Sequence, residues 1–446
     1  MRRTFAFAGA GRRVAVAAAA VALLAGAAAC SKDNPADNSL DGAGKTIKVW
    51  LMVDAQSGWQ NVVDDATARF KSETGADVKI EYQQWGDRYA RTDAALAGNN
   101  GPDVYEMGNT DAPRYVFDGA FAPVDTSKFE NSNTWLTGLS DPCTLDGTVY
   151  CVPYYAGARV LIYRTDLLQS AGLTPPTTYA DLLTDLQTLQ TSNAADKNFA
   201  AFYMPGAYWY AAMAWVYGEG GQIATKGSDG KWTGSLSDPK AIAGLQKWAD
   251  LQHTYSKGDP TKDENDQDAI FAQGHAAFLY GNGWEVGAVQ SVHQDPNDPA
   301  SKLVDGPIKG KVAAVPMPGA SADKSLPSFL GGSVLGVAYH SKYPALAAEW
   351  IKIFTDSQSQ DALIAKGALP NATALLDKAA QQPGNEATAN AAATSWFVPM
   401  APNWSNVEQQ SVLQTMLRDI ATGHKSVADA AAWADGQISQ ILNAGS

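Results

Sequence analysis

Hydrophobic positions in residues 46–107 switch repeatedly between strand-like and helix-like spacing. Residues 46–53, TIKVWLMV, form an apolar run that predicts a buried strand. A one-sided apolar helix follows and ends at Gly75, residues 77–82 alternate as a second strand, and residues 87–97 are helical again. GPDVYEM at 101–107 predicts a third strand. This alternation predicts an α/β fold with a mostly parallel sheet flanked by helices.

The middle of the chain has a different pattern. YCVPYYAGARVLIYRTDLL at residues 150–168 is one long strand-like run, and we expect it to cross between two lobes. Helical spacing then dominates from about residue 160 to residue 280. TYADLLTDLQTLQ at 178–190 has one apolar side, and Asp238 followed by proline opens another helix.

The last third of the chain returns to strands and then ends in helices. KVAAVPMPG at 311–319 and SVLGVAYH at 333–340 are strand-like, and residues 343–367 are helical. The tail from 406 to 442 predicts two helices. The length of 446 residues and the apolar content of 45% suit two domains or one large two-lobed domain.

The N-terminus has the pattern of an export signal. Four arginines precede a short Ala-rich apolar segment and then Cys30, so residues 1–29 are predicted to be a cleaved signal peptide. LAGAAAC resembles a bacterial lipobox, in which the cysteine is lipidated, although Ala27 stands where Leu is usual. A plain secretory signal is the alternative. Residues 30–45 predict a flexible, lipid-anchored tether outside the cell.

Charge and cysteine content limit the partners. Without the four signal arginines, 29 basic residues face 46 acidic ones, a net charge of −17. This balance disfavours nucleic acid and anionic ligands and fits a neutral or cationic ligand.

Cys143 and Cys151 flank the turn in CTLDGTVYC, and export favours a structural disulfide across a hairpin.

The sequence contains no motif for covalent chemistry. It has no H-E-x-x-H and no P-loop, its five histidines lack metal-ligand spacing, and GGSVLG misses the G-x-S-x-G elbow by one residue. We therefore predict no catalytic residue, no metal and no cofactor. A secreted glycoside hydrolase stays open as the enzyme alternative, because its two carboxylates leave no sequence signature.

Segments spread along the whole chain form a recognisable ordered set. They are IKVWLMVDA, FKSETGADVKIEY, LAGNNGPDVYEMGN, FDGAFAPVD, VPYYAGARVLIYRTDLLQSAGLTPPTTYADLL, IFAQGHAAFLYGNGWEVGAV, and VAAVPMPG with FLGGSVLGVAYHS. In this order they resemble the extracellular solute-binding proteins of ABC importers, in the sugar-binding family that includes maltose-binding protein. The resemblance implies two α/β lobes that enclose a ligand in the cleft between them. It implies a monomer that delivers a neutral di- or oligosaccharide to the transmembrane subunits of an ABC permease. We expect the lobes at 46–155 plus 316–366 and 156–315 plus 367–446.

A sugar presents an apolar face and a ring of hydroxyls, so its site combines aromatic rings with short polar side chains. The resemblance places Asp54 at a carboxylate that binds a hydroxyl; a helix cap is the alternative. In QQWGDR, Trp85 is predicted to stack on the ligand or to pack within the lobe. Asp87 and Arg88 are predicted to bind hydroxyls.

The next two loops supply further candidates. Asn109 and Asp111, in EMGNTDAPRY, lie where the family has polar contacts, but Met107 replaces a family aromatic. An Asx turn is the alternative for Asp111. The family's acidic contact at the hinge aligns with Gly157, so that Tyr155 or Arg159 takes its place. Arg159 either pairs with a buried acid or reaches the cleft.

Residues 205–221, PGAYWYAAMAWVYGEGG, contain five aromatic rings. One helix face cannot hold all of them, because residues one or two apart point in different directions. We expect Trp215 and Tyr217 to pack inward. Of Tyr208, Trp209 and Tyr210, at least one is expected to face the cleft; an entirely buried cluster is the alternative.

Trp284, in GNGWEVG, matches the family's stacking tryptophan, with Asn282 and Glu285 as polar neighbours. Gly332 resembles a backbone edge that lines the cleft. Trp404 matches a second stacking ring, with packing onto the C-terminal helices as the alternative. So many rings favour more than a monosaccharide, and maltose-, trehalose-, cellobiose- and chitobiose-like sugars all fit. A non-sugar solute, such as a polyamine or peptide, is the second binding hypothesis.

Overall fold

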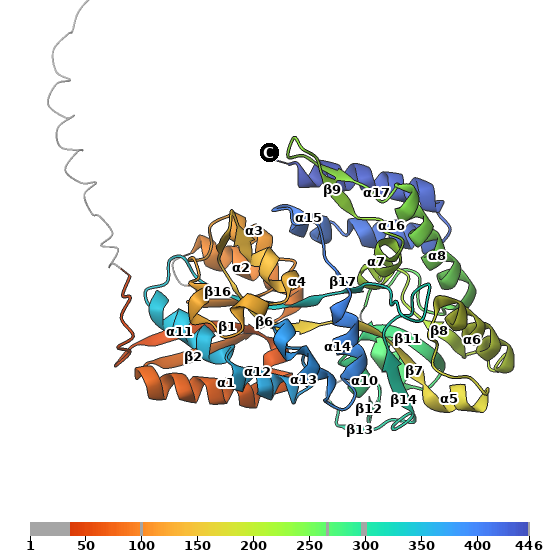
Figure 1. The fold of residues 1–446 in the computed structure, drawn as a ribbon, viewed down its shortest axis with the longest axis horizontal. Helices are drawn as coiled ribbons and strands as arrows, with labels where there is room; N and C mark the ends of the chain where they lie inside the picture. Colours follow the sequence, from red (N-terminus) through yellow and green to blue (C-terminus); the bar gives the residue numbers. More distant parts are fainter. Residues whose placement is uncertain (1–35, 99–100, 265–266, 296–300, 445–446) are drawn as a thin grey trace, which may run out of the picture. The chain divides into compact units, whose positions relative to one another are not determined.

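Two β-sheets organise residues 36–98, 101–264, 267–295 and 301–444, which are the residues that the computed structural model describes (Figure 1). The first sheet has the strand order β2 (Asp77–Gln83), β1 (Thr46–Met52), β3 (Val104–Gly108), β16 (Gly331–Val337) and β6 (Val152–Gly157). The second has the order β14 (Val312–Val315), β7 (Arg159–Arg164), β11 (Ala276–Asn282) and β8 (Ala200–Tyr203). We call each sheet with its associated helices a lobe. The predicted signal peptide and Cys30 lie outside the described residues.

The strand directions are more mixed than the sequence suggested. Strand β1 is parallel to β2 and β3, but β16 is antiparallel to both β3 and β6. In the second sheet only the β11–β8 pair is parallel. Strands β6, β7, β14 and β16 come from segments that cross between the sheets, and no strand–helix–strand repeat forces them to be parallel. The two-lobed α/β class holds, whereas the predominance of parallel pairs does not.

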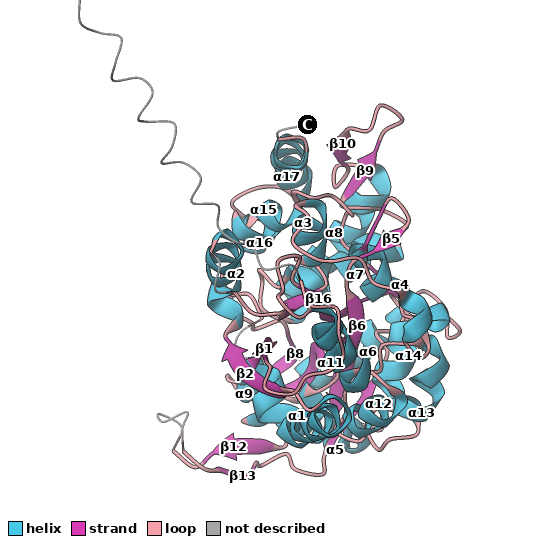
Figure 2. Cartoon of the chain, turned by 90° about the vertical axis from the view of Figure 1, so that its left-hand side faces the viewer, coloured by secondary structure: helices cyan, strands magenta, loops and turns pink. Residues whose placement is uncertain are grey.

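Helices cover both lobes, and α1, α11 and α12 pack against one another beside the first sheet (Figures 1 and 2). The helices are α1 (Val53–Thr74), α2 (Arg88–Ala97), α3 (Ala112–Phe117), α4 (Thr137–Ser140), α5 (Thr165–Ser170), α6 (Tyr179–Ser192), α7 (Trp209–Gly218), α8 (Pro239–Tyr255), α9 (Gln267–Ala272), α10 (Glu285–Ala288), α11 (Pro344–Phe354), α12 (Ser357–Ile364), α13 (Leu376–Ala380), α14 (Glu386–Ala393), α15 (Trp404–Gln409), α16 (Val412–Ala421) and α17 (Val427–Leu442). Four short strand pairs complete the fold: β4 (Thr144–Leu145) with β5 (Thr148–Val149), β9 (Ala224–Lys226) with β10 (Trp232–Gly234), β12 (Ser291–His293) with β13 (Leu303–Asp305), and β15 (Ser328–Phe329) with β17 (Ser395–Trp396).

Local signals explain several helix ends. Gly75 closes α1 in a left-handed conformation with φ of 75°, and Thr178 forms a capping box with Asp181 at the start of α6. The tail holds three helices rather than the predicted two. Ser411 takes φ of 52°, so the chain cannot continue as one helix from α15 into α16.

The disulfide prediction is confirmed. Cys143 and Cys151 are bonded across the β4–β5 hairpin, with Cα atoms 5.0 Å apart. Asp146 and Gly147 form its turn with φ of 50° and 79°, which suits the Asp-Gly pair. Among the described residues no helix is long and apolar enough to cross a membrane, and no cluster of His, Cys, Asp and Glu side chains is arranged to hold a metal ion.

The crossing segments are tied together where the lobes meet. The Arg159 backbone N–H donates to Ser328 Oγ at 2.7 Å, and this hydroxyl donates back to the Arg159 carbonyl at 3.1 Å. Strands β6 and β7 are separated by Ala158 alone, so one extended run leaves the first sheet and enters the second. The exact lobe boundaries given above stay a prediction.

Candidate functional site

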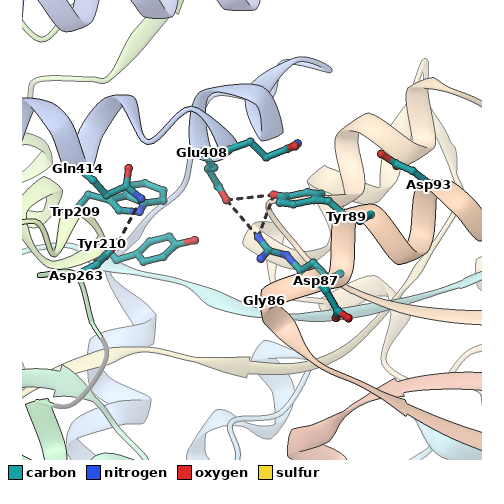
Figure 3. A pocket seen from close by; sticks show the side chains of 12 residues that line it. Gly86, Asp87, Tyr89, Asp93, Trp209, Tyr210, Asp263, Glu408 and Gln414 are labelled. Atoms are coloured by element: carbon teal, nitrogen blue, oxygen red, sulfur yellow. Dashed lines mark hydrogen bonds and ion pairs between the residues drawn. The ribbon is translucent and has the colours of Figure 1, made fainter.

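A pocket of about 660 Å³ lies between the two lobes (Figure 3). The first lobe contributes the segment from Gly86 through α2, and the second lobe contributes α7, the loop after α8, α15 and α16. The lining residues are Gly86, Asp87, Arg88, Tyr89, Ala90, Asp93, Trp209, Tyr210, Asp263, Glu408, Gln409 and Gln414. The wall therefore combines aromatic rings, carboxylates, amides and one guanidinium group.

The aromatic part of this wall comes from the start of α7. The rings of Trp209 and Tyr210 are stacked, with centroids 3.8 Å apart, and Tyr210 is the more accessible of the two. Tyr208 is fully buried. Trp215 is also buried, and Tyr217 stacks on Trp396 inside the second lobe. The five rings are thus divided as the sequence predicted, with two at the pocket.

A hydrogen-bonded cluster forms the opposite wall. Arg88 Nε donates to Asp111 Oδ2 at 2.7 Å, and the Tyr89 hydroxyl donates to Asp111 Oδ1 at 2.5 Å. Asp111 is only 2% exposed, so it supports the wall from behind. The indole N–H of Trp85 donates to the Asp54 carboxylate beside this cluster. Asp87 and Arg88 thus line the pocket, and their contacts to ligand hydroxyls stay a prediction, whereas Asp54, Trp85 and Asp111 lie beside or behind this wall.

Two carboxyl groups of the second lobe have pKa values above their ordinary range. Burial raises the pKa of Glu408 to about 7; the charge of Asp111 adds to the rise and Arg88 opposes it. Burial also raises the pKa of Asp263 to about 6, with the charge of Glu264 as the next cause. The Gln414 amide donates to Asp263 at 3.3 Å. Both carboxyl groups are able to accept hydrogen bonds from hydroxyl groups.

Arg159 pairs with the partly exposed acid Glu264, so of its two predicted roles the ion pair is the one present. Its Nη2 lies 3.0 and 2.8 Å from the two Glu264 oxygens, and its Nε donates to the Tyr208 hydroxyl at 2.5 Å. The guanidinium carbon lies 4.6 Å from the ring centroid of Tyr210. Arg159 is 4% exposed, so it positions the aromatic wall from below instead of reaching the cleft.

Trp404 is a correction. We expected its ring to stack on a ligand, but it is fully buried in the second lobe, 6.0 Å from Trp209. Its indole N–H donates to Glu408 at 2.6 Å. The ring lies on the core side of the start of α15, so the packing alternative describes it.

Asn109 is the second correction, because it is 2% exposed and its amide group donates to the carbonyls of Gly138 and Leu330. Tyr208 was one of three candidate rings at the start of α7, and it does not face the pocket: its ring is buried, and its hydroxyl accepts a hydrogen bond from Arg159. Both side chains already use their polar groups within the protein, so they shape the site without facing it.

The predicted ligand contacts around the end of β11 do not line the pocket formed by the described residues. Trp284 is 62% exposed, yet the described residues that line the pocket do not include it. Glu285 is 1% exposed and accepts hydrogen bonds from Gln267 and Asn282. Burial raises the pKa of Glu285 to about 7, and these hydrogen bonds oppose the rise. Glu285 is therefore a buried structural acid that fixes Asn282.

Tyr155 and Gly332 also lie outside the pocket wall formed by the described residues. Tyr155 is partly buried and meets Trp59 edge to face at 5.0 Å. Gly332 takes φ of 146°, and a Cβ there would lie 2.2 Å from the Tyr155 carbonyl oxygen. Glycine is needed at this position because the two strands approach so closely.

Several pocket residues escaped the sequence analysis. They are Tyr89, Asp93, Asp263, Glu408, Gln409 and Gln414, together with Glu264 beneath the wall. Tyr89 directly follows Arg88, so its position next to a predicted site residue was a signal for it. Nothing in the local pattern distinguishes the others from solvated polar residues.

The fold and the pocket together define a protein that holds a small solute between two lobes. The chain belongs to the bacterial extracellular solute-binding protein family, whose model matches residues 65–395. It is therefore a solute-binding protein and not an enzyme, and the resemblance to the binding proteins of ABC importers is confirmed.

Individual relatives agree with this assignment. The chain is 33% identical to the diacetylchitobiose binding protein DasA of Streptomyces coelicolor over 97% of this chain and 99% of the relative. It is 24% identical to the maltodextrin-binding protein MdxE of Bacillus subtilis, over 92% of each. The GacH receptor of Streptomyces glaucescens has a similar fold, with a TM-score of 0.74, 20% identity, and coverage of 89% of this chain and 98% of that structure.

Proposed function

We propose that this chain binds a neutral di- or oligosaccharide between its lobes and delivers it to an ABC permease. The stacked rings of Trp209 and Tyr210, facing polar side chains of the other lobe across one pocket, carry the proposal. A sugar packs its apolar face on a ring, while carboxylates and amides accept and donate hydrogen bonds at its hydroxyls. In this proposal Cys30 anchors the protein to the outer face of the cell membrane.

The ligand class is narrowed by the relatives. DasA is named as a diacetylchitobiose binding protein and MdxE as a maltodextrin-binding protein, and DasA has the higher identity to this chain. We therefore place chitobiose-like disaccharides first among the candidate sugars. The carboxylates at the pocket leave a cationic solute as the competing class.

Calorimetric titration of the purified protein tests this proposal. The panel comprises N,N′-diacetylchitobiose, maltose, cellobiose and trehalose, with N-acetylglucosamine and spermidine as comparisons. We expect one disaccharide to bind with a dissociation constant of about 1 μM, or roughly 8 kcal/mol. Binding of spermidine without binding of any sugar would contradict the proposal.

Replacing Tyr210 with alanine is expected to weaken sugar binding by about tenfold or more, because the accessible ring of the stacked pair is lost. Tyr339→Ala is the matched control, since that ring is 64% exposed and lies outside the described pocket wall. Both variants are titrated with the sugar that binds the wild type. Equal affinities for the two variants would remove Tyr210 from the binding site.

A further inference from the structure

One residue of the second lobe touches the first lobe across the pocket. Glu408 Oε2, on α15, lies 3.7 Å from Arg88 Nη2 and 3.5 Å from the Tyr89 hydroxyl oxygen. Arg88 and Tyr89 belong to α2 of the first lobe. Figure 3 shows Glu408 between Tyr89 on one side and the aromatic wall on the other. These contacts are long, so they join the lobes without locking them.

Each half of this contact keeps its own partners. Arg88 and Tyr89 are both held by Asp111 within the first lobe, at 2.7 and 2.5 Å. Glu408 Oε1 is held by the Trp404 indole N–H within the second lobe, at 2.6 Å. When the lobes separate, neither half loses the bonds that orient it, and only the contacts between the lobes break. This arrangement suits a contact that forms and opens repeatedly.

The contact also places two carboxylates beside one guanidinium group. Asp111 and Glu408 share the single guanidinium group of Arg88, and their side chains are only 2% and 8% exposed. Asp111 already takes the two shorter bonds from this cluster. Hydrogen bonds with Trp404 and Thr110 stabilise the Glu408 carboxylate, but the charge of Asp111 acts on it more strongly than that of Arg88, so a proton on Glu408 would relieve the repulsion.

We propose that Glu408, Arg88 and Tyr89 form an interlobe latch, and that protonation of Glu408 favours the closed arrangement of the lobes. The proposal concerns the same pocket as the proposed sugar site, but it needs no ligand to operate. Glu408 acts here as a positioning residue that couples the two lobes.

The direction of the pH effect follows from the acidity of Glu408. Its pKa is about 7 with the latch formed, mainly because of burial, against an ordinary value of 4.5. The Asp111 charge, which Glu408 meets across the lobes, contributes more to this rise than Arg88 opposes it, so closure is favoured as the pH falls through 7, by at most about tenfold in the closed-to-open ratio per pH unit. Well above pH 7 the carboxylate is charged in both states and adds no pH dependence.

Other titratable groups face Glu408, and their charges also influence its protonation. Arg88 and Tyr89 approach from α2, Asp111 from the loop before α3, and Tyr210 from α7. Asp263 lines the same pocket and has a raised pKa of about 6. Asp263→Asn therefore serves as a second control, because it removes that titration and leaves the latch residues in place.

Fluorescence energy transfer between the lobes tests the latch without sugar. Dyes are attached at Glu73→Cys on α1 and Ser192→Cys on α6, both exposed, in a Cys30→Ser background that leaves only the bonded Cys143–Cys151 pair. The closed fraction of this labelled protein is measured at pH 8.0 and pH 5.5. We expect the closed-to-open ratio to rise about tenfold or more at the lower pH.

In the same background, Glu408→Gln should show the same closed fraction at both pH values, near the low-pH value of the unsubstituted protein. Exposed Glu386→Gln is the matched control and should retain the full pH response. Tyr89→Phe removes the hydroxyl contact with Glu408, together with the bond to Asp111, and keeps the Glu408 carboxylate; it should shift the protein towards the open state. The latch is refuted if Glu408→Gln keeps the pH response, or if Asp263→Asn abolishes it. Because no sugar is added, failure to find a sugar ligand would not affect this result.

Discussion

Replacing Trp404 with alanine is expected to lower the free energy of unfolding by about 3–5 kcal/mol. The side chain is fully buried in the second lobe and packs beside Trp209, so its removal leaves a large cavity. It also frees Glu408 from its 2.6 Å hydrogen bond, which leaves a buried acid with one partner fewer. Chemical denaturation of the ligand-free protein measures this loss.

Trp284→Ala is the matched control for Trp404→Ala. This ring is 62% exposed, and its removal should change the free energy of unfolding by no more than about 0.5 kcal/mol. Both tryptophans were predicted from the sequence to stack on the ligand, so the pair tests the difference that the structure makes between them. A loss for Trp404→Ala as small as that expected for Trp284→Ala would mean that Trp404 is not a core residue.

Replacing Arg159 with methionine is expected to destabilise the protein by about 3–5 kcal/mol. Methionine keeps much of the side-chain length but leaves Glu264 unpaired and the buried Tyr208 hydroxyl without its donor. Glu264 keeps some contact with water, with 26% of its side chain exposed, so the loss should lie near the lower end of that range. Denaturation at pH 7 measures it.

The loss should extend to ligand binding, because the Arg159 guanidinium lies against Tyr210 and holds the aromatic wall. Lys309→Met is the control, since the Lys309–Asp305 pair is exposed on both sides and is expected to contribute less than about 1 kcal/mol. Arg159→Lys keeps the charge but not the planar fork and should fall between the two. An Arg159→Met protein as stable as Lys309→Met would contradict the supporting role given to Arg159.

Much of the fold follows from local sequence. The strand at 46–53, the helix ended by Gly75 and the Cys143–Cys151 hairpin each rest on neighbouring residues, and each lies where the pattern predicts it. Strand direction in the second sheet could not be predicted from neighbouring residues. It depends on pairing between β7, β11 and β14, which are far apart in the chain.

The site was predicted only in part, for the same physical reason. Dense aromatic residues at the start of α7 had to be divided between core and pocket. Helical geometry predicted that Trp215 packs inward, but it left open which of Tyr208, Trp209 and Tyr210 faces the cleft. At the start of α15 a single aromatic residue gives no helical pattern from which to predict the side it faces, and Trp404 is buried. Asp263 and Glu408 reach the pocket only through long-range packing, so no local pattern marks them.

A crystal structure of the protein with the tightest-binding sugar from the titration panel tests the central claim most directly. We predict electron density for a sugar ring against Trp209 and Tyr210, with its hydroxyls within hydrogen-bond distance of carboxylates or amides from both lobes. Sugar bound elsewhere, for example on the exposed face of Trp284 with the pocket empty, would contradict the account.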